Sequence, residues 1–173
     1  MNIAVVRTSG SYYFRPDTTL NREALDYYLP DGVGELALTP CIYSKVIKAG
    51  KCISQKFALR HIDNFGFGVL LDAVGAEPQE ATCMDATSYL SGDTLPFSGI
   101  GDAAFEVSVN GEPVFSSSSS SAFDAGMLTE ALASVTRRSS VRATDLLAVC
   151  LCEPVILHKG DYFCFAGKKV SIL

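Results

Sequence analysis

The sequence predicts a β-rich α+β domain, and three observations lead to this fold class. Apolar and polar residues alternate with a period of two in many short segments that Gly, Pro or Asn separates. Two such segments are joined by Asn110-Gly111, a strong hairpin signal because a type I′ turn needs positive φ at both positions. Helical periodicity is confined to about two segments, and 173 residues suit one domain spanning 1–173.

The N-terminal half contains strands and one predicted helix. Strands are expected over residues 11–15, 26–29 and 35–47. Pro40 cannot donate a ladder hydrogen bond, so the third strand should lie at a sheet edge or be bulged there. A helix is expected over 54–65, where Ser54 can cap the first turn ahead of a short apolar face. Residues 66–71 should follow as a buried strand.

The C-terminal half contains the remaining strands and the better helix. Strands are expected over residues 104–109, 112–115, 145–152, 162–165 and 170–173. The helix is expected from Asp124 to Arg138, because apolar side chains recur there at helical spacing. That apolar face consists of Met127, Leu128, Ala131, Leu132 and Val135. The serine tract Ser116–Ser121 is expected to be a solvated loop.

Composition and charge exclude several function classes. The formal net charge is −5 and the pI is near 5.0. The densest basic spots are only residue pairs, so no nucleic-acid binding is expected. No apolar run approaches the roughly 18–20 residues that span a bilayer, so no membrane partner is expected. The first residues meet Arg7 too early for a signal peptide, and a cytoplasmic location is the default.

The apolar content bears on assembly. The hydrophobic fraction is 48 % and the mean hydropathy is +0.23, which is rich for a soluble domain. Part of this apolar surface is expected to lie in a subunit interface, and a homodimer is the expected assembly. Buried strands alone would account for the same composition, so that alternative stays open at the level of the sequence.

The six cysteines are expected to be free, buried thiols, because four of them lie in apolar or strand-like surroundings: Cys41, Cys150, Cys152 and Cys164. No Cys-x-x-Cys pair is present, so the usual zinc and redox spacings are absent. One alternative is a zinc site built from Cys41, Cys150, Cys152 and His158. Cys150 and Cys152 would share one strand face, but a spacing of two residues is not a usual chelating spacing. A Cys–His nucleophile pair using His61 or His158 is a weaker alternative.

Four stretches in collinear order resemble segments of the fumarylacetoacetate hydrolase family. Residues 13–20 (Tyr-Phe-Arg-Pro-Asp-Thr-Thr-Leu) resemble the family's Phe-Phe-x-Lys-Pro-x-(Ser/Thr)-x-Leu segment. Residues 50–69, which begin Gly-Lys and end Gly-Phe-Gly-Val, resemble its Gly-Lys, helix and Gly-x-(Gly/Asn)-Asp run. Residues 109–112 (Val-Asn-Gly-Glu) resemble its Asn-Gly-Glu hairpin. Residues 144–147 and 159–161 resemble two turns near its end.

This resemblance implies a mixed β-roll or sandwich, commonly dimeric, with a metal-dependent chemistry. Members of the family cleave carbon–carbon bonds in acylpyruvate-like substrates, and some relatives decarboxylate or isomerise 2-oxo acids. A divalent metal chelates the substrate oxygens and stabilises the enolate that forms. Mg²⁺ and Mn²⁺ prefer carboxylate oxygens, which the family supplies as Glu-x-Glu on one strand and Asp on another.

The resemblance places the three metal positions at Thr39, Cys41 and Leu70, none of which is an acid. A hydroxyl, a thiol and an alkyl chain cannot replace carboxylates around a hard cation. The ancestral magnesium or manganese site is therefore expected to be lost, and no cofactor is expected. Glu35 and Asp72 lie near the lost positions but out of register.

A ligand-binding role is expected at two positions only, Arg15 and Asp85, and no catalytic residue is assigned. Arg15 stands where the family often has a substrate-facing Lys, and a guanidinium can bind a carboxylate bidentately. The alternative is a surface cation on a strand. Asp85 matches an Asp that follows the family's catalytic lysine, whose own position holds Thr82. The alternative for Asp85 is a turn-capping role.

These positions predict a pseudoenzyme, a non-catalytic member of the family that acts as a dimeric scaffold, a regulatory partner or a binder of small carboxylates. The alternative is a hydrolase or decarboxylase of acylpyruvate-like or 2-oxo acid substrates with a rearranged active site. A rearranged enzyme should show a new cluster of titratable groups where the old ones are lost. The matched positions instead hold a hydroxyl, a thiol and an alkyl chain.

Overall fold

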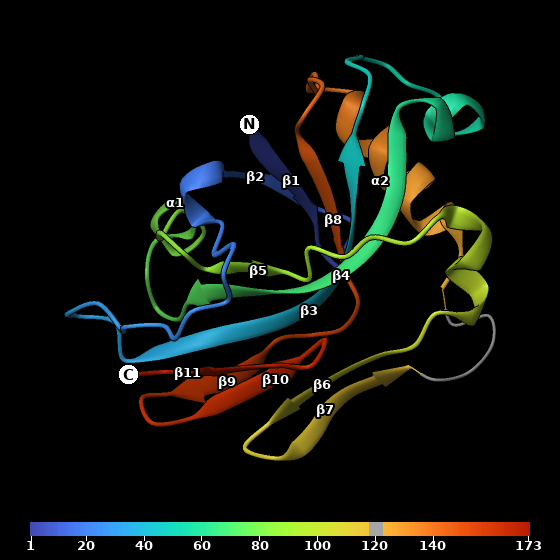
Figure 1. The fold of residues 1–173 in the computed structure, drawn as a ribbon. Helices are drawn as coiled ribbons and strands as arrows, with labels where there is room; N and C mark the ends of the chain where they lie inside the picture. The colour runs from blue at the N-terminus through green and yellow to red at the C-terminus, as the bar shows by residue number, and fades with distance from the viewer. Residues whose placement is uncertain (118–122) are drawn as a thin grey trace.

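Strands dominate the computed structural model, which describes residues 1–117 and 123–173 (Figure 1). The strands are β1 (Asn2–Val6), β2 (Tyr12–Pro16), β3 (Glu35–Val46), β4 (Ile62–Ala73), β5 (Ser88–Leu90), β6 (Phe105–Val109), β7 (Glu112–Ser117), β8 (Leu146–Cys150), β9 (Val155–His158), β10 (Tyr162–Phe165) and β11 (Lys168–Ser171). The α-helices are α1 (Pro78–Ala81) and α2 (Ala125–Thr136), and the 3₁₀ helices are η1 (Asp17–Thr19), η2 (Gln55–Arg60) and η3 (Phe97–Asp102). The predicted β-rich α+β class is confirmed.

Seven strands form one curled sheet, in the order β2-β1-β8-β3-β4-β5 with β9 also paired to β3. The longest strands, β3 and β4, form an antiparallel ladder along most of their length, and Figure 1 shows both curving across the molecule. The ends of the sheet meet where Leu20, just beyond β2, forms a bridge with Ser88 of β5. The Asn21 N–H donates to the Ser88 carbonyl there at 2.9 Å. The sheet therefore closes into a roll with an inner face.

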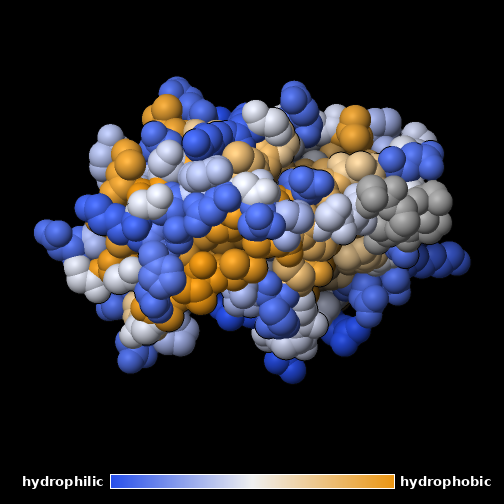
Figure 2. All heavy atoms as spheres, turned by 90° about the horizontal axis from the view of Figure 1, so that it is seen from below, coloured by the Kyte–Doolittle hydropathy of each residue, from blue (hydrophilic) through white to orange (hydrophobic). Residues whose placement is uncertain are grey.

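A second sheet, in the order β11-β10-β6-β7, covers part of the outside of the roll and lies below it in Figure 1. Aromatic side chains join the layers. Phe67 of β4 stacks on Phe105 of β6 with ring centroids 4.6 Å apart, and Tyr89 of β5 meets Phe163 of β10 edge-on at 5.3 Å. The main hydrophobic core includes these rings and the buried face of α2. Seen from below, apolar side chains form a band across the surface (Figure 2).

The predicted helix at Asp124–Arg138 is confirmed as α2. Asp124 is its N-cap, and the Asp124 carboxylate accepts a hydrogen bond from the Met127 N–H at 3.2 Å. Leu128, Leu132 and Val135 are buried, as the apolar spacing predicts, and the helix packs on η2 and β8. No helix of the described chain is long and apolar enough to cross a membrane.

The predicted hairpin is also confirmed, with β6 and β7 joined at Asn110-Gly111. Asn110 has φ 52° and Gly111 has φ 88°, as a type I′ turn requires. The loop expected at Ser116–Ser121 is wrong for Ser116 and Ser117, which extend β7 because they pair with residues of β6. Residues 118–121 of that tract lie outside the described residues.

Two predicted elements need correction. Residues 26–29 form no strand: Tyr27 makes a single bridge to Ile172, and Pro30 cannot extend the pairing. The helix expected over 54–65 is a 3₁₀ helix that ends at Arg60, and β4 begins at Ile62. The apolar alternation that starts at Ile62 pairs with β3, and this tertiary pairing overrides the weak helical spacing. Strands β1, β5 and β9 were not predicted.

Pro40 lies in the middle of the roll, and the expectation of an edge or a bulge at Pro40 is wrong. β3 pairs with β4 on one side along its length. On the other side β9 pairs with residues 35–38 and β8 with residues 41–45, so Pro40 falls between two partner strands. The Pro40 carbonyl accepts from the Leu151 N–H at 2.9 Å. The missing N–H therefore faces the junction of β8 and β9, where no ladder partner is lost.

Candidate functional site

The inner face of the roll carries a small apolar cluster of its own. Residues two apart on a strand point to the same face, so each strand contributes alternate side chains. The buried members are Ile3, Val5, Cys41, Tyr43, Leu70, Ala148 and Cys150. Two of the three positions that the resemblance matches to metal ligands, Cys41 and Leu70, therefore lie in apolar surroundings inside the roll.

A cavity of about 400 Å³ opens at one end of the roll beside this cluster. Its wall includes Arg7, Tyr13, Thr39, Asp72 and Cys150. Glu153, between β8 and β9, lies at the same rim, where its carboxylate accepts from the Thr8 hydroxyl at 2.5 Å. Segments far apart in the chain thus place guanidinium, phenol, hydroxyl, carboxylate and thiol groups around one hollow.

The three matched metal positions meet in space. Thr39 pairs directly with Leu70 across the β3–β4 ladder, and Cys41 pairs with Gly68. Thr39 lines the cavity, whereas Cys41 and Leu70 are buried beside it. Asp72 is two residues beyond Leu70 and so lies on the same strand face. The donor set at the matched positions is one hydroxyl and one thiol, which does not fit a hard divalent cation.

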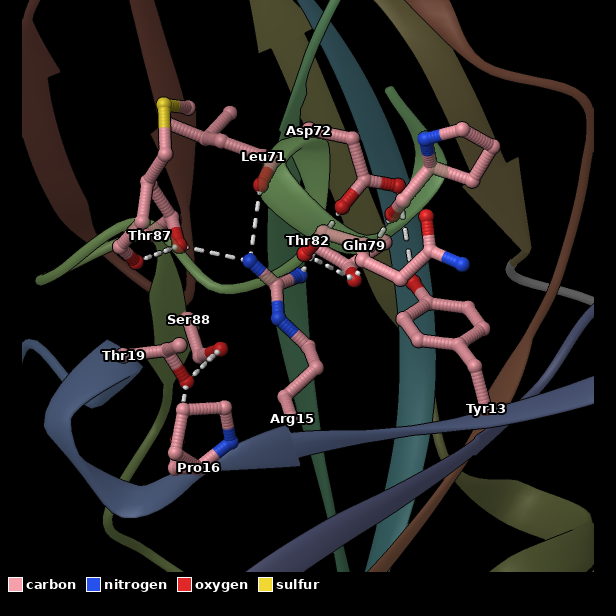
Figure 3. Close-up of polar contacts among 12 residues, drawn as sticks. Tyr13, Arg15, Pro16, Thr19, Leu71, Asp72, Gln79, Thr82, Thr87 and Ser88 are labelled. Carbon is pink, nitrogen blue, oxygen red and sulfur yellow. Dashed lines mark hydrogen bonds and ion pairs between the residues drawn. The ribbon is translucent and has the colours of Figure 1, made fainter. Parts of the chain in front are cut away.

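Arg15 is wholly buried and pairs with a carboxylate of its own chain. Its exposed fraction is 0 %, and its Nη1 lies 3.3 Å from Asp72 Oδ1, an ion pair without hydrogen-bond alignment. Its Nη2 donates to the Leu71 carbonyl at 2.8 Å and to the Thr87 hydroxyl at 2.5 Å. Figure 3 shows the guanidinium pointing from β2 toward β4. The alternative of a surface cation is wrong, because closure of the roll covers this face of β2.

Burial controls the ionisation of the groups beside Arg15. Desolvation raises the pKa of Asp72, while Arg15, Arg7 and a hydrogen bond from Tyr13 act in the opposite direction. The Tyr13 hydroxyl donates to Asp72 Oδ2 at 3.4 Å. Burial, with the Asp72 charge second, raises the pKa of Tyr13 above its ordinary value of 10.0. Tyr13 therefore stays protonated at neutral pH and acts as a hydrogen-bond donor.

Arg7 is the exposed cation of the cavity wall, and it is not among the site residues expected from the sequence. Its guanidinium carbon lies 4.7 Å from the centre of the Tyr13 ring. Among the described residues, no carboxylate forms an ion pair with it. The alternation of Ile3, Val5 and Arg7 would have placed Arg7 on one strand face with two apolar residues. Only the closure of the roll shows that this face borders a cavity.

The other predicted residues lie elsewhere. Thr82 ends α1, and its hydroxyl donates to the Pro78 carbonyl at 3.0 Å. Asp85 is exposed and is not part of the cavity wall, so its ligand role stays a prediction. Glu35 lies at the far end of β3, where its carboxylate is 3.1 Å from His158 Nε2. Of the acids noted near the lost metal positions, Asp72 reaches the cavity and Glu35 does not.

The cysteines are free thiols, as predicted, but only Cys41 and Cys150 are buried, whereas Cys152 and Cys164 are half-buried and Cys52 and Cys83 are exposed. Cys41 pairs with Cys150 across β3 and β8, and burial raises the pKa of Cys150 to about 12 and that of Cys41 well above its ordinary value. No group of three His, Cys, Asp or Glu side chains among the described residues can hold a metal ion. The zinc alternative is therefore wrong, because His158 binds Glu35 on another part of β3.

Comparison with known proteins identifies the fold. No protein-family model matches the sequence, and no curated protein matches it significantly. Among solved structures, a protein assigned to the fumarylacetoacetate hydrolase family from Yersinia pestis is similar with a TM-score of 0.77 and 17 % identity, covering 99 % of this chain and 92 % of that one. A 2-hydroxyhepta-2,4-diene-1,7-dioate isomerase from Mycobacterium marinum gives 0.78 and 14 %, covering 99 % and 74 %.

A third similar structure is fumarylpyruvate hydrolase from Pseudomonas aeruginosa in complex with Mn²⁺ and pyruvate. Its TM-score is 0.72 at 15 % identity, with 100 % of this chain and 89 % of that chain covered. Likeness over the whole chain establishes that this protein has the fold of the fumarylacetoacetate hydrolase family. The resemblance of the four sequence stretches is thereby confirmed at the level of the fold.

Proposed function

We propose that this chain is a non-catalytic member of the fumarylacetoacetate hydrolase family, which binds a small carboxylate in the cavity at the end of its roll. It acts in the cytoplasm as a homodimer. One observation carries the non-catalytic part: Thr39 and Leu70, the paired positions that would face each other as metal ligands, offer one hydroxyl and no carboxylate.

Loss of the metal would remove the main source of catalysis. A bound divalent cation supplies several kcal/mol by neutralising the enolate as it forms. Of the carboxylates that line the cavity, Asp72 lies closest in sequence to the matched metal positions. Asp72 is already paired with the buried guanidinium of Arg15 at 3.3 Å. Recruiting Asp72 to a cation would leave that guanidinium buried without a counter-charge, which costs several kcal/mol.

The carboxylate ligand is supported by Arg7 rather than Arg15. Arg15 has its own carboxylate and no exposed surface. Arg7 stands at the cavity rim over the Tyr13 ring, so a ligand carboxylate can approach it from the hollow. A charge-assisted hydrogen bond of this kind contributes about 1.5–3 kcal/mol. The neighbouring Ser9 also lines the cavity and adds a hydroxyl group that can bind a 2-oxo acid.

A rearranged enzyme remains the second candidate, because the structure brings titratable groups together at the cavity. Tyr13 and Asp72 are hydrogen-bonded there, and burial raises the pKa of both. Such a pair is the kind of cluster that a reused active site needs. Turnover of a 2-oxo acid that needs no metal and is lost in Tyr13→Phe would favour this candidate over the binder.

Thermal shift with pyruvate, oxaloacetate and an acylpyruvate tests the binding proposal. Arg7→Ala should abolish the ligand-induced rise in Tm, because it removes the exposed cation of the cavity wall. Arg60→Ala is the matched control, since Arg60 is also exposed and lies 4.9 Å from an aromatic ring, that of Phe57, outside the cavity wall. Equal ligand shifts in wild type and Arg7→Ala would refute carboxylate binding at this cavity.

A further inference from the structure

The thiols of Cys41 and Cys150 lie on adjacent strands inside the roll. The hydrogen-bond pattern between these strands determines how the two residues are positioned relative to each other. Cys41 of β3 is the direct partner of Cys150 of β8. The Leu151 N–H donates to the Pro40 carbonyl at 2.9 Å, and the Val46 N–H donates to the Asp145 carbonyl at 2.8 Å. Hydrogen-bonded and non-hydrogen-bonded pairs alternate along an antiparallel ladder. The Cys41–Cys150 pair, one step from the Pro40–Leu151 pair, is therefore a non-hydrogen-bonded pair.

This position brings the side chains within reach of a disulfide. Cα atoms in such a pair lie about 4.5 Å apart, closer than the about 5.5 Å of hydrogen-bonded pairs. Disulfides join cysteines whose Cα atoms are about 4.4–6.8 Å apart. Both cysteines are free in this structure, so the strands already hold two reduced thiols at a separation that a disulfide spans.

The cavity gives a small reagent access to the pair. Cys41 is 0 % exposed, whereas Cys150 is 9 % exposed and forms part of the cavity wall. A reagent in the cavity therefore meets the Cys150 sulfur first, with Cys41 directly behind it. Burial keeps both thiols protonated at neutral pH, because it raises the pKa of each. Because the thiolate is the reactive form, oxidation of the pair by a peroxide is accordingly slow.

We infer that Cys41 and Cys150 form a redox-active pair that closes to an internal disulfide when a peroxide enters the cavity. The sulfur of Cys150 attacks one peroxide oxygen, so an S–O bond forms, the O–O bond breaks, and the thiol proton leaves with the departing hydroxide as water. The sulfur of Cys41 then attacks the Cys150 sulfur. An S–S bond forms, the S–O bond breaks, and the hydroxide leaves with the Cys41 proton as a second water. Two thiols are oxidised and one peroxide is reduced.

The disulfide would covalently link β3 and β8, two strands that contribute side chains to the cavity wall. β3 carries Thr39 and β8 carries Cys150, both of which line the cavity. Joining positions 41 and 150 closes a loop of more than a hundred residues, which restricts the unfolded chain and stabilises the fold. This inference rests on the pairing of the two strands and on the opening of the cavity at Cys150, and it does not depend on whether the cavity binds a carboxylate.

Peptide mapping of the oxidised protein tests the inference. The background is Cys52→Ser/Cys83→Ser, which removes the two exposed thiols and so reduces links between molecules. Hydrogen peroxide is added until the exposed Met1 is oxidised, free thiols are alkylated, and the protein is digested with trypsin without reduction. The expected product links peptide 23–45 to peptide 143–159 with a mass loss of about 2 Da, the two hydrogens removed.

The oxidised protein should melt at least about 5 °C higher than the reduced protein, and dithiothreitol should reverse the shift.

Single variants identify the sulfurs involved. Because Cys150 and Cys152 lie in one tryptic peptide, the link must persist in Cys152→Ser and disappear in Cys150→Ala and Cys41→Ala. A folded, Met1-oxidised protein that carries no link between these peptides overturns the inference. A link that survives Cys150→Ala and is lost in Cys152→Ser also overturns it. The Cys52→Ser/Cys83→Ser background retains both Cys41 and Cys150. Peptide mapping of this protein therefore tests the inference even if Cys41→Ala does not fold.

Discussion

Thr39 lies directly opposite Leu70 in the antiparallel ladder of β3 and β4. The two residues are far apart in the sequence, and the family resemblance assigns both to the metal centre. Their pairing supports that assignment, because metal ligands must converge in space. It also supports the proposed loss of the metal, since the pair presents a hydroxyl and an alkyl chain to the end of the roll.

Removing the carboxylate of Asp72 should strongly destabilise the fold. Asp72→Asn leaves the Arg15 guanidinium buried without a counter-charge, and breaking a buried ion pair from one side costs about 3–5 kcal/mol. Urea unfolding measures the change in free energy. The matched control is Asp85→Asn, an exposed acid, which should change stability by less than about 0.5 kcal/mol.

The double variant Arg15→Met/Asp72→Leu completes this test. It replaces both charges by apolar side chains and should recover most of the lost stability, because neither partner is then left buried and unpaired. If Asp72→Asn is no less stable than Asp85→Asn, the buried ion pair does not contribute to the stability of the fold as we argue.

A single methyl group at Gly68 should disturb the roll. A Cβ at Gly68 would lie 2.5 Å from the Tyr89 carbonyl oxygen, a backbone atom of the neighbouring strand that cannot move alone. Gly68→Ala should therefore cost roughly 1–3 kcal/mol. Gly99→Ala is the control, because nothing lies within 4 Å of its Cβ. Thermal unfolding that shows equal Tm values for the two variants would contradict the close approach of β4 and β5.

Asp161 should contribute stability that is lost in acid. Hydrogen bonds from the His158 N–H, and then from the Asn110 side chain, lower the pKa of Asp161 below its ordinary value of 3.8. A carboxyl with a depressed folded pKa stabilises the protein above pH 3.8 and loses that contribution as the pH falls through the folded value.

Asp161→Asn should accordingly be less stable than wild type by up to about 1 kcal/mol near pH 6, and the difference should shrink toward pH 3. The measurement is urea unfolding at several pH values. Asp63→Asn, an exposed acid whose carboxylate accepts no hydrogen bond within the described residues, should show no such pH-dependent difference. A constant difference between Asp161→Asn and wild type would contradict the lowered pKa.

Much of the fold was predictable because it depends on local signals. Asn110-Gly111 specified its hairpin through backbone geometry, and Asp124 began its helix through a cap that needs only nearby residues. Pro40 was placed wrongly at an edge, because the sequence cannot show that two different strands meet beside it. The segment 54–65 was placed wrongly because pairing with β3 decides the conformation of Ile62, and that partner is distant in the chain.

The candidate site was only partly predictable for the same reason. The resemblance led to Thr39, Cys41 and Leu70 through sequence register, and these positions do converge. Arg15 has the side chain expected of a carboxylate ligand, yet its partner is Asp72 of the same chain. The orientation of β2 toward β4 follows from closure of the roll, which no local pattern encodes. Arg7 was missed because its face becomes a cavity wall only after that closure.

Assembly as a homodimer is expected from the exposed apolar surface. Large apolar side chains that are exposed in the described chain include Leu25, Tyr28, Ile47, Phe57, Leu59, Leu95 and Ile156. Figure 2 shows apolar side chains gathered in a band on one face, and contiguous patches of this kind mark interaction sites. Light scattering should give twice the chain mass of 18.5 kDa. A monomer mass at micromolar and higher concentrations would remove the support for a dimer.

The most direct test of the proposed function is titration with manganese, followed by an assay of acylpyruvate hydrolysis by absorbance. Mn²⁺ needs about six oxygen ligands, with carboxylates among them, and the matched positions offer Thr39, Cys41 and Leu70. We expect no binding heat at millimolar Mn²⁺ and no acylpyruvate hydrolysis above background. Manganese-dependent turnover that is abolished by a change at Glu35 or Asp72 would contradict this account, because it would place an intact metal site in a different register.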